Sequence, residues 1–188
     1  MRPLLRAALP ALALVVSSTL SVEAQQTSPV AVDLREDIER VEKKLIDLAR
    51  AIPEEKYSWR PGTGVRSVGE VLLHISADNY LMPSAIGFPA DAASGVKGDD
   101  YNTALAFEKK TMNKAAMIAE LERSFAYLKK HLSDTPSARM AQPVSMFGMS
   151  ITGQKAWILT TTHLHEHLGQ LIAYARSNGV VPPWSGGA

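Results

Sequence analysis

Two histidines four residues apart are the strongest chemical signal in this sequence. They are His163 and His167, within Thr162-His163-Leu164-His165-Glu166-His167-Leu168-Gly169-Gln170. A helix turns about 100° per residue, so His167 falls roughly 40° from His163 and one turn further along the same face. Two imidazoles so placed can each bring a nitrogen to about 2.0–2.1 Å from one metal ion. His165 points about 200° away from His163, so it cannot share that ion.

The pair alone is a weak signal, because histidines at this spacing are more often surface residues or hydrogen-bonded core residues. His74 strengthens it. This residue lies in the apolar run Val71-Leu72-Leu73-His74-Ile75. Taken alone, it would be a buried histidine with one satisfied hydrogen bond. Opposite the pair across a helical core, it would complete a site of three nitrogens.

Three further residues share the faces of these histidines. Asp78 falls one turn after His74, where it can be an outer partner of that imidazole, an additional oxygen ligand, or a general base. Gln170 and Tyr174 continue the stripe of His163 and His167, and we predict that they contact a substrate.

The elements that must position these residues are four amphipathic helices. Apolar residues at spacings of three and four predict helices over 33–52, 67–86, 113–132 and from 150 or 152 to 178. Ser67 and Glu70 form a capping box at the start of the second. Residues 25–32 and 133–151 are predicted to be irregular, and 88–110 to begin as a loop. His131, in the last turn of the third helix, fits exposure or an interaction with the helix terminus better than ligation. The fold class expected is an all-α four-helix bundle.

The N-terminal segment resembles a secretory signal peptide. Arg2 and Arg6 precede a short apolar run, and Val22-Glu23-Ala24 supplies a small-residue cleavage region. We therefore predict a signal peptide over 1–24, a single domain over 25–188, and a secreted or periplasmic protein. Retention of the segment as a membrane anchor is the alternative, although the apolar run is short for a bilayer.

Composition excludes several classes of function. The full chain has 20 Lys and Arg against 19 Asp and Glu, and residues 1–24 contain two arginines and one glutamate, so the mature chain is formally neutral. Nucleic-acid binding normally needs a basic surplus on one face, so no nucleic-acid partner is expected. Cysteine is absent, which excludes disulfides, thiolate ligands and cysteine nucleophiles. No association with the membrane is expected after signal cleavage.

The chain resembles the DinB-like metal-binding four-helix bundles. The resemblance rests on Trp59-Arg60-Pro61, Ser67-Val68-Gly69-Glu70-Val71-Leu72-Leu73-His74, the His163 to Gln170 segment, Ala175-Arg176 and Gly179-Val180-Val181-Pro182-Pro183. It implies a bundle with a three-histidine metal site at one end, with ligands at His74, His163 and His167 and a non-ligand at His165. Some relatives are thiol-dependent transferases, isomerases or metal-dependent hydrolases. The export signal departs from that pattern and weakens the thiol-transferase interpretation.

These observations predict an exported protein with a divalent metal ion. Three protein ligands plus water is typical of a catalytic zinc site; zinc is the first expectation, and nickel, manganese and iron also accept imidazole. The expected activity is that of a metal-dependent hydrolase or transferase acting on an unidentified small molecule. The alternative is a non-catalytic protein whose metal is structural or scavenged. The sequence leaves open whether the protein forms a homodimer.

Overall fold

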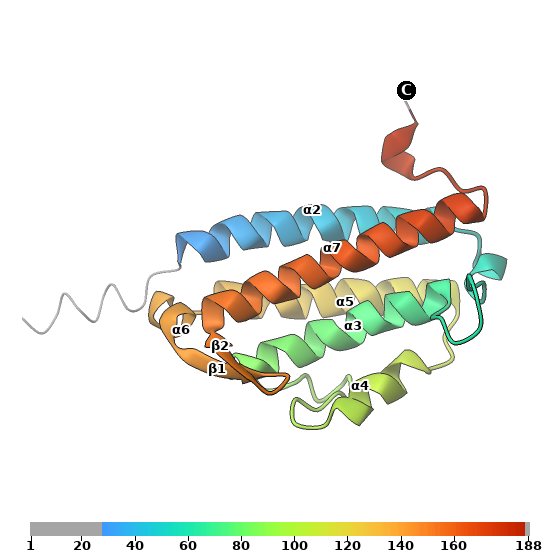
Figure 1. The fold of residues 1–188 in the computed structure, drawn as a ribbon. Helices are drawn as coiled ribbons and strands as arrows, with labels where there is room; N and C mark the ends of the chain where they lie inside the picture. Colours follow the sequence, from blue (N-terminus) through green and yellow to red (C-terminus); the bar gives the residue numbers. More distant parts are fainter. Residues whose placement is uncertain (1–27, 187–188) are drawn as a thin grey trace, which may run out of the picture.

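The computed structural model describes residues 28–186, and four long helices dominate it (Figure 1). They are α2 (Pro29–Ala51), α3 (Val68–Ala85), α5 (Lys114–Ser133) and α7 (Gly153–Ser177). α2 packs against α5 and α7, and α3 packs against the same two helices, so the four enclose one core. The predicted all-α four-helix bundle is confirmed. The predicted signal peptide lies outside the described residues.

Side-chain caps explain where three of these helices begin. The Ser67 hydroxyl accepts a hydrogen bond from the Glu70 amide at 3.2 Å, and the Glu70 carboxylate accepts one from the Ser67 amide at 2.7 Å. This is the capping box that the sequence predicted for α3. Asn113 caps α5, and Thr152 caps α7.

The first helix begins earlier than predicted. It starts at Pro29 rather than near Asp33, so residues 29–32 are helical and not an irregular leader. Proline suits the first helical position, because the N–H that it lacks would have no partner there. Ala31 is buried in the core, which adds an apolar contact to this first turn.

A short helix occupies the end of the segment that the sequence predicted to begin as a loop. This helix, α4 (Tyr101–Glu108), is capped by the Asp100 side chain. Figure 1 shows that it lies outside the four-helix core, beside α3. Ala104 and Phe107 are buried in a small cluster with residues of α3. The face that carries these two residues also carries Glu108.

A β-hairpin precedes α7 where the sequence predicted irregular chain. Strands β1 (Pro143–Met146) and β2 (Met149–Thr152) pair antiparallel, with Met146 opposite Met149. The two-residue turn is Phe147-Gly148, and both residues have positive φ, 50° and 76°. Two positive φ values in a two-residue turn are typical of the type I′ hairpin. The strands are only four residues long, which is too short for an alternating pattern to be distinctive.

The remaining elements are short. A 3-10 turn η1 (Glu54–Lys56) follows α2, helix α6 (Ser137–Ala141) precedes β1, and a second 3-10 turn η2 (Pro183–Ser185) follows α7 and packs near α2. Within residues 28–186, no helix is both long enough and apolar enough to span a membrane. The largest fully buried side chains are Trp157, Tyr80, Phe107, Phe125, Ile38, Leu45, Leu48, Ile52, Leu72, Leu73, Ile75 and Ile86.

Candidate metal centre

The three predicted ligands come together between two neighbouring helices. His74 projects from α3, and His163 and His167 project from successive turns of α7. Ring centroids lie 5.2 Å apart for His74 and His163, 4.6 Å for His74 and His167, and 4.4 Å for His163 and His167. One potential ligand atom from each ring lies within 4.8 Å of the others. The cluster can therefore hold a metal ion.

Hydrogen bonds orient two of these imidazoles. The Nδ1 atom of His74 lies 2.7 Å from Glu108 Oε1, and Nδ1 of His167 lies 2.8 Å from Gln170 Oε1. Both partners are acceptors, so each Nδ1 carries the proton and each Nε2 keeps its lone pair. This is how proteins commonly fix the orientation and tautomer of a metal-binding histidine.

His167 offers the clearest fit to a metal ion. Its Nε2 atom is buried, and no other described residue makes a hydrogen bond to it. A buried nitrogen with a free lone pair loses solvation unless something else occupies it. Burial also lowers the pKa of His167 to about 4, so the ring stays neutral and able to bind a metal at ordinary pH. The donor set and the unpaired nitrogen both fit a divalent ion.

Asp78 lies against the same atoms. Its Oδ2 atom is 2.8 Å from Nε2 of His163 and 3.3 Å from Nε2 of His74. Its other oxygen, Oδ1, is buried and has no hydrogen-bond partner among the described residues. The carboxylate is only 4% exposed. One oxygen of Asp78 therefore faces the histidines, and the hydrogen-bonding capacity of the other is unused within the described part of the chain.

Glu108 connects His74 to a cation. The Arg66 guanidinium donates to both Glu108 oxygens, at 2.7 and 3.0 Å, while Oε1 also accepts from His74. Burial alone would raise the pKa of Glu108. The hydrogen bonds from His74 and Arg66 outweigh it, and the pKa is lowered. The carboxylate is therefore ionised, which favours the protonated Nδ1 of His74 and makes its Nε2 a better ligand.

A second chain of hydrogen bonds returns from Arg66 to the other helix. The Tyr174 hydroxyl donates to the Arg66 carbonyl at 3.2 Å, and the Gln170 amide donates to the Tyr174 hydroxyl at 2.9 Å. The Gln170 oxygen then accepts from His167. The Trp59 and Tyr174 rings pack edge to face, with centroids 5.2 Å apart. Two of the three ligands are thus joined through Arg66 by an unbroken chain of hydrogen bonds.

The structure places the other sequence-predicted residues as follows. Gln170 contacts both His167 and Tyr174, and neither Gln170 nor Tyr174 lines the cavity at the histidines. Their predicted role as substrate contacts stays a prediction. His165 lies on another face of α7, where its Nε2 is 2.6 Å from Asp37 of α2. The cluster lies near the middle of α3 and α7, not at one end of the bundle as the resemblance implied.

Sequence reasoning missed Glu108 altogether. It lies 34 positions after His74, and the two residues meet only because α4 packs beside α3. A signal was present in the spacing of Ala104, Phe107 and Glu108, which puts a carboxylate on the apolar stripe of a short helix. A charged residue on such a stripe needs a buried partner, and here that partner is His74.

Two of the three clustered histidines line a cavity of about 290 Å³. Its wall includes His74, Asp78 and His163, together with apolar side chains from the hairpin and from Tyr101 at the start of α4. A small molecule in this cavity would therefore lie beside His74 and His163, on the side of the bundle that carries α4 and the hairpin.

The fold and the site define a helical bundle with a three-histidine cluster able to hold a metal ion. A sequence model of the DinB superfamily matches residues 37–171, which is more than half of the chain. This protein belongs to the DinB superfamily.

Two solved structures are similar in fold. A DinB-like protein from Bacillus subtilis has a TM-score of 0.60 and 18% identity, covering 78% of this chain and 92% of that one. A DinB-like protein from Bacillus cereus ATCC 10987 has a TM-score of 0.65 and 17% identity, covering 85% and 97%. Likeness at such low identity concerns the fold alone. No protein with a curated description matches this chain.

Proposed function

We propose that this protein is an exported, metal-dependent hydrolase or transferase that acts on a small molecule at the three-histidine site. One observation carries the proposal: two of the three clustered histidines, His74 and His163, line a cavity of about 290 Å³ together with Asp78, whose Oδ1 has no hydrogen-bond partner among the described residues. A structural metal is normally enclosed by four protein ligands, whereas a catalytic metal keeps an open position. Export is supported by the sequence of residues 1–24 alone.

The residues divide into binding and proton-transfer roles. His74, His163 and His167 would hold the ion, zinc in the first instance, with nickel, manganese or iron as other metals that imidazole accepts. When bound, a divalent ion supplies a Lewis acid that polarises a substrate oxygen. Glu108 and Gln170 hold two of the imidazoles in orientation. Asp78 Oδ1 would accept the proton that the attacking nucleophile releases, because it belongs to the carboxylate beside His74 and His163 and has no hydrogen-bond partner in the part of the chain that the structure describes.

Elemental analysis of the purified protein tests the site. We expect about one equivalent of divalent metal in the wild type and a severe loss in His74→Ala, because that variant leaves two protein nitrogens. His165→Ala is the matched control, since it removes an imidazole from the same helix outside the cluster. One equivalent surviving in His74→Ala, or loss of metal in His165→Ala with helicity retained, would refute the assignment.

Asp78 separates the catalytic proposal from the structural alternative. If Asp78 is the proton acceptor, Asp78→Asn keeps its metal and loses turnover of any ester, amide or thiol substrate found by screening with the metal-loaded wild type. If Asp78 is a fourth ligand that closes the site, Asp78→Asn loses metal as severely as a histidine variant. The second result would overturn the enzyme proposal in favour of a structural metal.

A further inference from the structure

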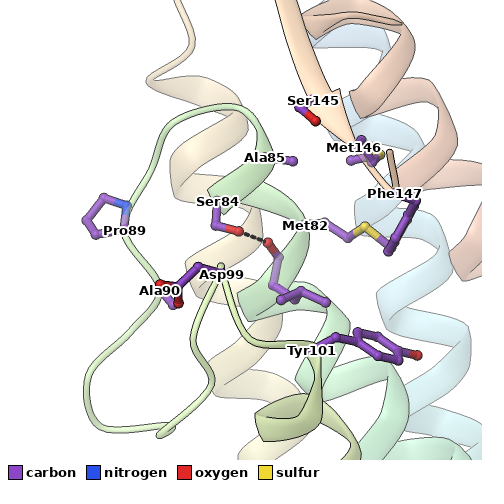
Figure 2. A pocket seen from close by; sticks show the side chains of 12 residues that line it. Met82, Ser84, Ala85, Pro89, Ala90, Asp99, Tyr101, Ser145, Met146 and Phe147 are labelled. Carbon is purple, nitrogen blue, oxygen red and sulfur yellow. Dashed lines mark hydrogen bonds between the residues drawn. The ribbon is translucent and has the colours of Figure 1, made fainter. Parts of the chain in front are cut away.

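The cavity at the histidines adjoins a larger one. The two share Met82, Tyr101, Met146 and Phe147 in their walls. The larger cavity has a volume of about 620 Å³ and extends away from the histidines, between the end of α3, the hairpin and the segment before α4. Figure 2 shows Met82 and Phe147 on one side of this space, with Pro89, Ala90 and Asp99 on the other. The two cavities lie next to each other, and of the two only the smaller one is lined by histidines.

The shared wall is apolar and reaches solvent. Phe147, at the hairpin tip, is 63% exposed, and Tyr101 is 46% exposed. Both belong to the wall that the two cavities share. Large apolar side chains gathered at the opening of a cavity mark a surface that gains free energy when an apolar group covers it. The two methionines beside them are flexible and adapt to ligands of different shape.

The charges around this space have one sign. The carboxylates in the two walls are Asp78, Glu166 and Asp99, and none of the described residues that form the walls is lysine or arginine. A negative charge at the end of a substrate far from the metal would meet Asp99, with no lysine or arginine in the walls to offset the repulsion. An uncharged substrate avoids this cost.

We infer that the substrate of the proposed metal site is an uncharged, elongated amphiphile, an acyl or alkyl compound whose polar group reacts at the histidines. Its carbon chain lies in the larger cavity, along Met82, Met146 and Phe147, and ends near Asp99. This inference rests on the proposed function, because it assigns the substrate class of the same site.

The probes are alkyl hydroxamates of increasing chain length, titrated against the zinc-loaded full chain. Their head group is uncharged in solution at neutral pH and chelates zinc. Each methylene adds about 4-fold in affinity when fully buried and about 2-fold when half-buried. Octanohydroxamate has six more methylenes than acetohydroxamate, so we expect it to bind at least about 60-fold more tightly. An equally long hydroxamate that ends in a carboxylate is expected to bind at least about 10-fold more weakly than octanohydroxamate.

The substitution Phe147→Ala tests where the carbon chain of the probe binds. We expect it to weaken octanohydroxamate by about 5-fold and to leave acetohydroxamate unchanged, because the ring covers the chain and not the head group. Val181→Ala is the matched control, since Val181 is an apolar side chain that is 61% exposed in the C-terminal tail, outside both walls. It should change neither affinity.

The outcomes separate the two proposals. If the protein binds zinc and acetohydroxamate but its affinity does not rise with the chain length of the hydroxamate, this inference is overturned and the metal site stands. Equal binding of the carboxylate-ended and methyl-ended probes overturns the charge argument. A protein that holds no zinc overturns the proposed function and the inference with it.

Discussion

The substitution Glu108→Gln tests whether a residue outside the cluster controls metal affinity. Glu108 has two oxygens, and one of them serves both His74 and Arg66. Glutamine keeps the shape but has one oxygen and one NH₂ group. If its oxygen stays on His74, its NH₂ faces the donors of Arg66, so at least one pairing is lost. The negative charge that favours a basic His74 Nε2 is lost as well.

The expected magnitude follows from these contacts. Loss of a hydrogen-bonding partner outside the ligand set typically lowers metal affinity by about 10- to 100-fold, which corresponds to about 1.4–2.7 kcal/mol. The free energy of unfolding of the metal-free protein should fall by less than this. The Arg66 side chain is 35% exposed, so solvent screens its ion pair with Glu108, and such pairs contribute about 1 kcal/mol or less. That loss would lower the melting temperature by about 2–4 °C in a domain of this size.

Two measurements distinguish the effects. Zinc affinity is determined by competition with a chromophoric chelator, and thermal unfolding is followed with excess chelator present. The matched control is Glu120→Gln. The Glu120 side chain is 13% exposed and accepts hydrogen bonds from Tyr80 and Arg123, both at 2.8 Å. Like Glu108, Glu120 is a largely buried carboxylate with an arginine partner, but it does not contact the histidines. Glu120→Gln should therefore lower the melting temperature and leave zinc affinity unchanged.

One pattern of results would refute the reasoning. If Glu108→Gln binds zinc within about twofold of the wild type while His74→Ala binds none, then Glu108 does not control the basicity or orientation of His74. If Glu120→Gln lowers zinc affinity as much as Glu108→Gln does, the effect reflects a general loss of stability.

Three further predictions concern other parts of the molecule. His131 packs between Phe88 and Tyr127, with ring centroids 4.4 and 4.2 Å away, and burial together with Lys130 lowers its pKa. The fold therefore favours the neutral ring, so this contribution to stability is full above the unfolded pKa of about 6.5 and is lost as pH drops below it. In urea unfolding of the chelator-treated protein between neutral pH and about pH 5, the free energy of unfolding of His131→Gln should fall less steeply with pH than that of the wild type. Identical pH dependences would contradict this prediction. N-terminal sequencing of exported material should find a start near Gln25, and a protein that still begins at Met1 would contradict the signal-peptide prediction. The formally neutral mature chain should bind DNA only weakly at physiological salt, so submicromolar, salt-sensitive binding in a gel-shift assay would show the charge argument to be wrong.

Features encoded by local spacing were predictable from the sequence. The capping box of Ser67 and Glu70 depends on residues three apart, and the shared face of His163 and His167 on residues four apart. Helical geometry alone relates such positions. The same geometry separates His165 from the pair, and the structure places it on Asp37.

Features that depend on packing between distant segments were not predictable in this way. No periodicity relates Glu108 to His74, and their contact exists only because α4 docks beside α3. His131 was expected to be exposed or to interact with the helix terminus. It packs between Phe88 and Tyr127 instead, because the chain after α3 folds back over the end of α5.

The hairpin tip reveals a conflict between what the backbone favours and which side chain is present. At φ 50°, Phe147 adopts a left-handed conformation that costs a residue with a Cβ about 1–2 kcal/mol. Asparagine before glycine is the sequence that this turn accepts most readily. Phe147→Asn should therefore raise the melting temperature while it removes the aromatic ring from the cavity wall. The fold would be more stable with a different residue here, so if Phe147 covers a substrate as inferred above, this one turn gives up stability in exchange for binding.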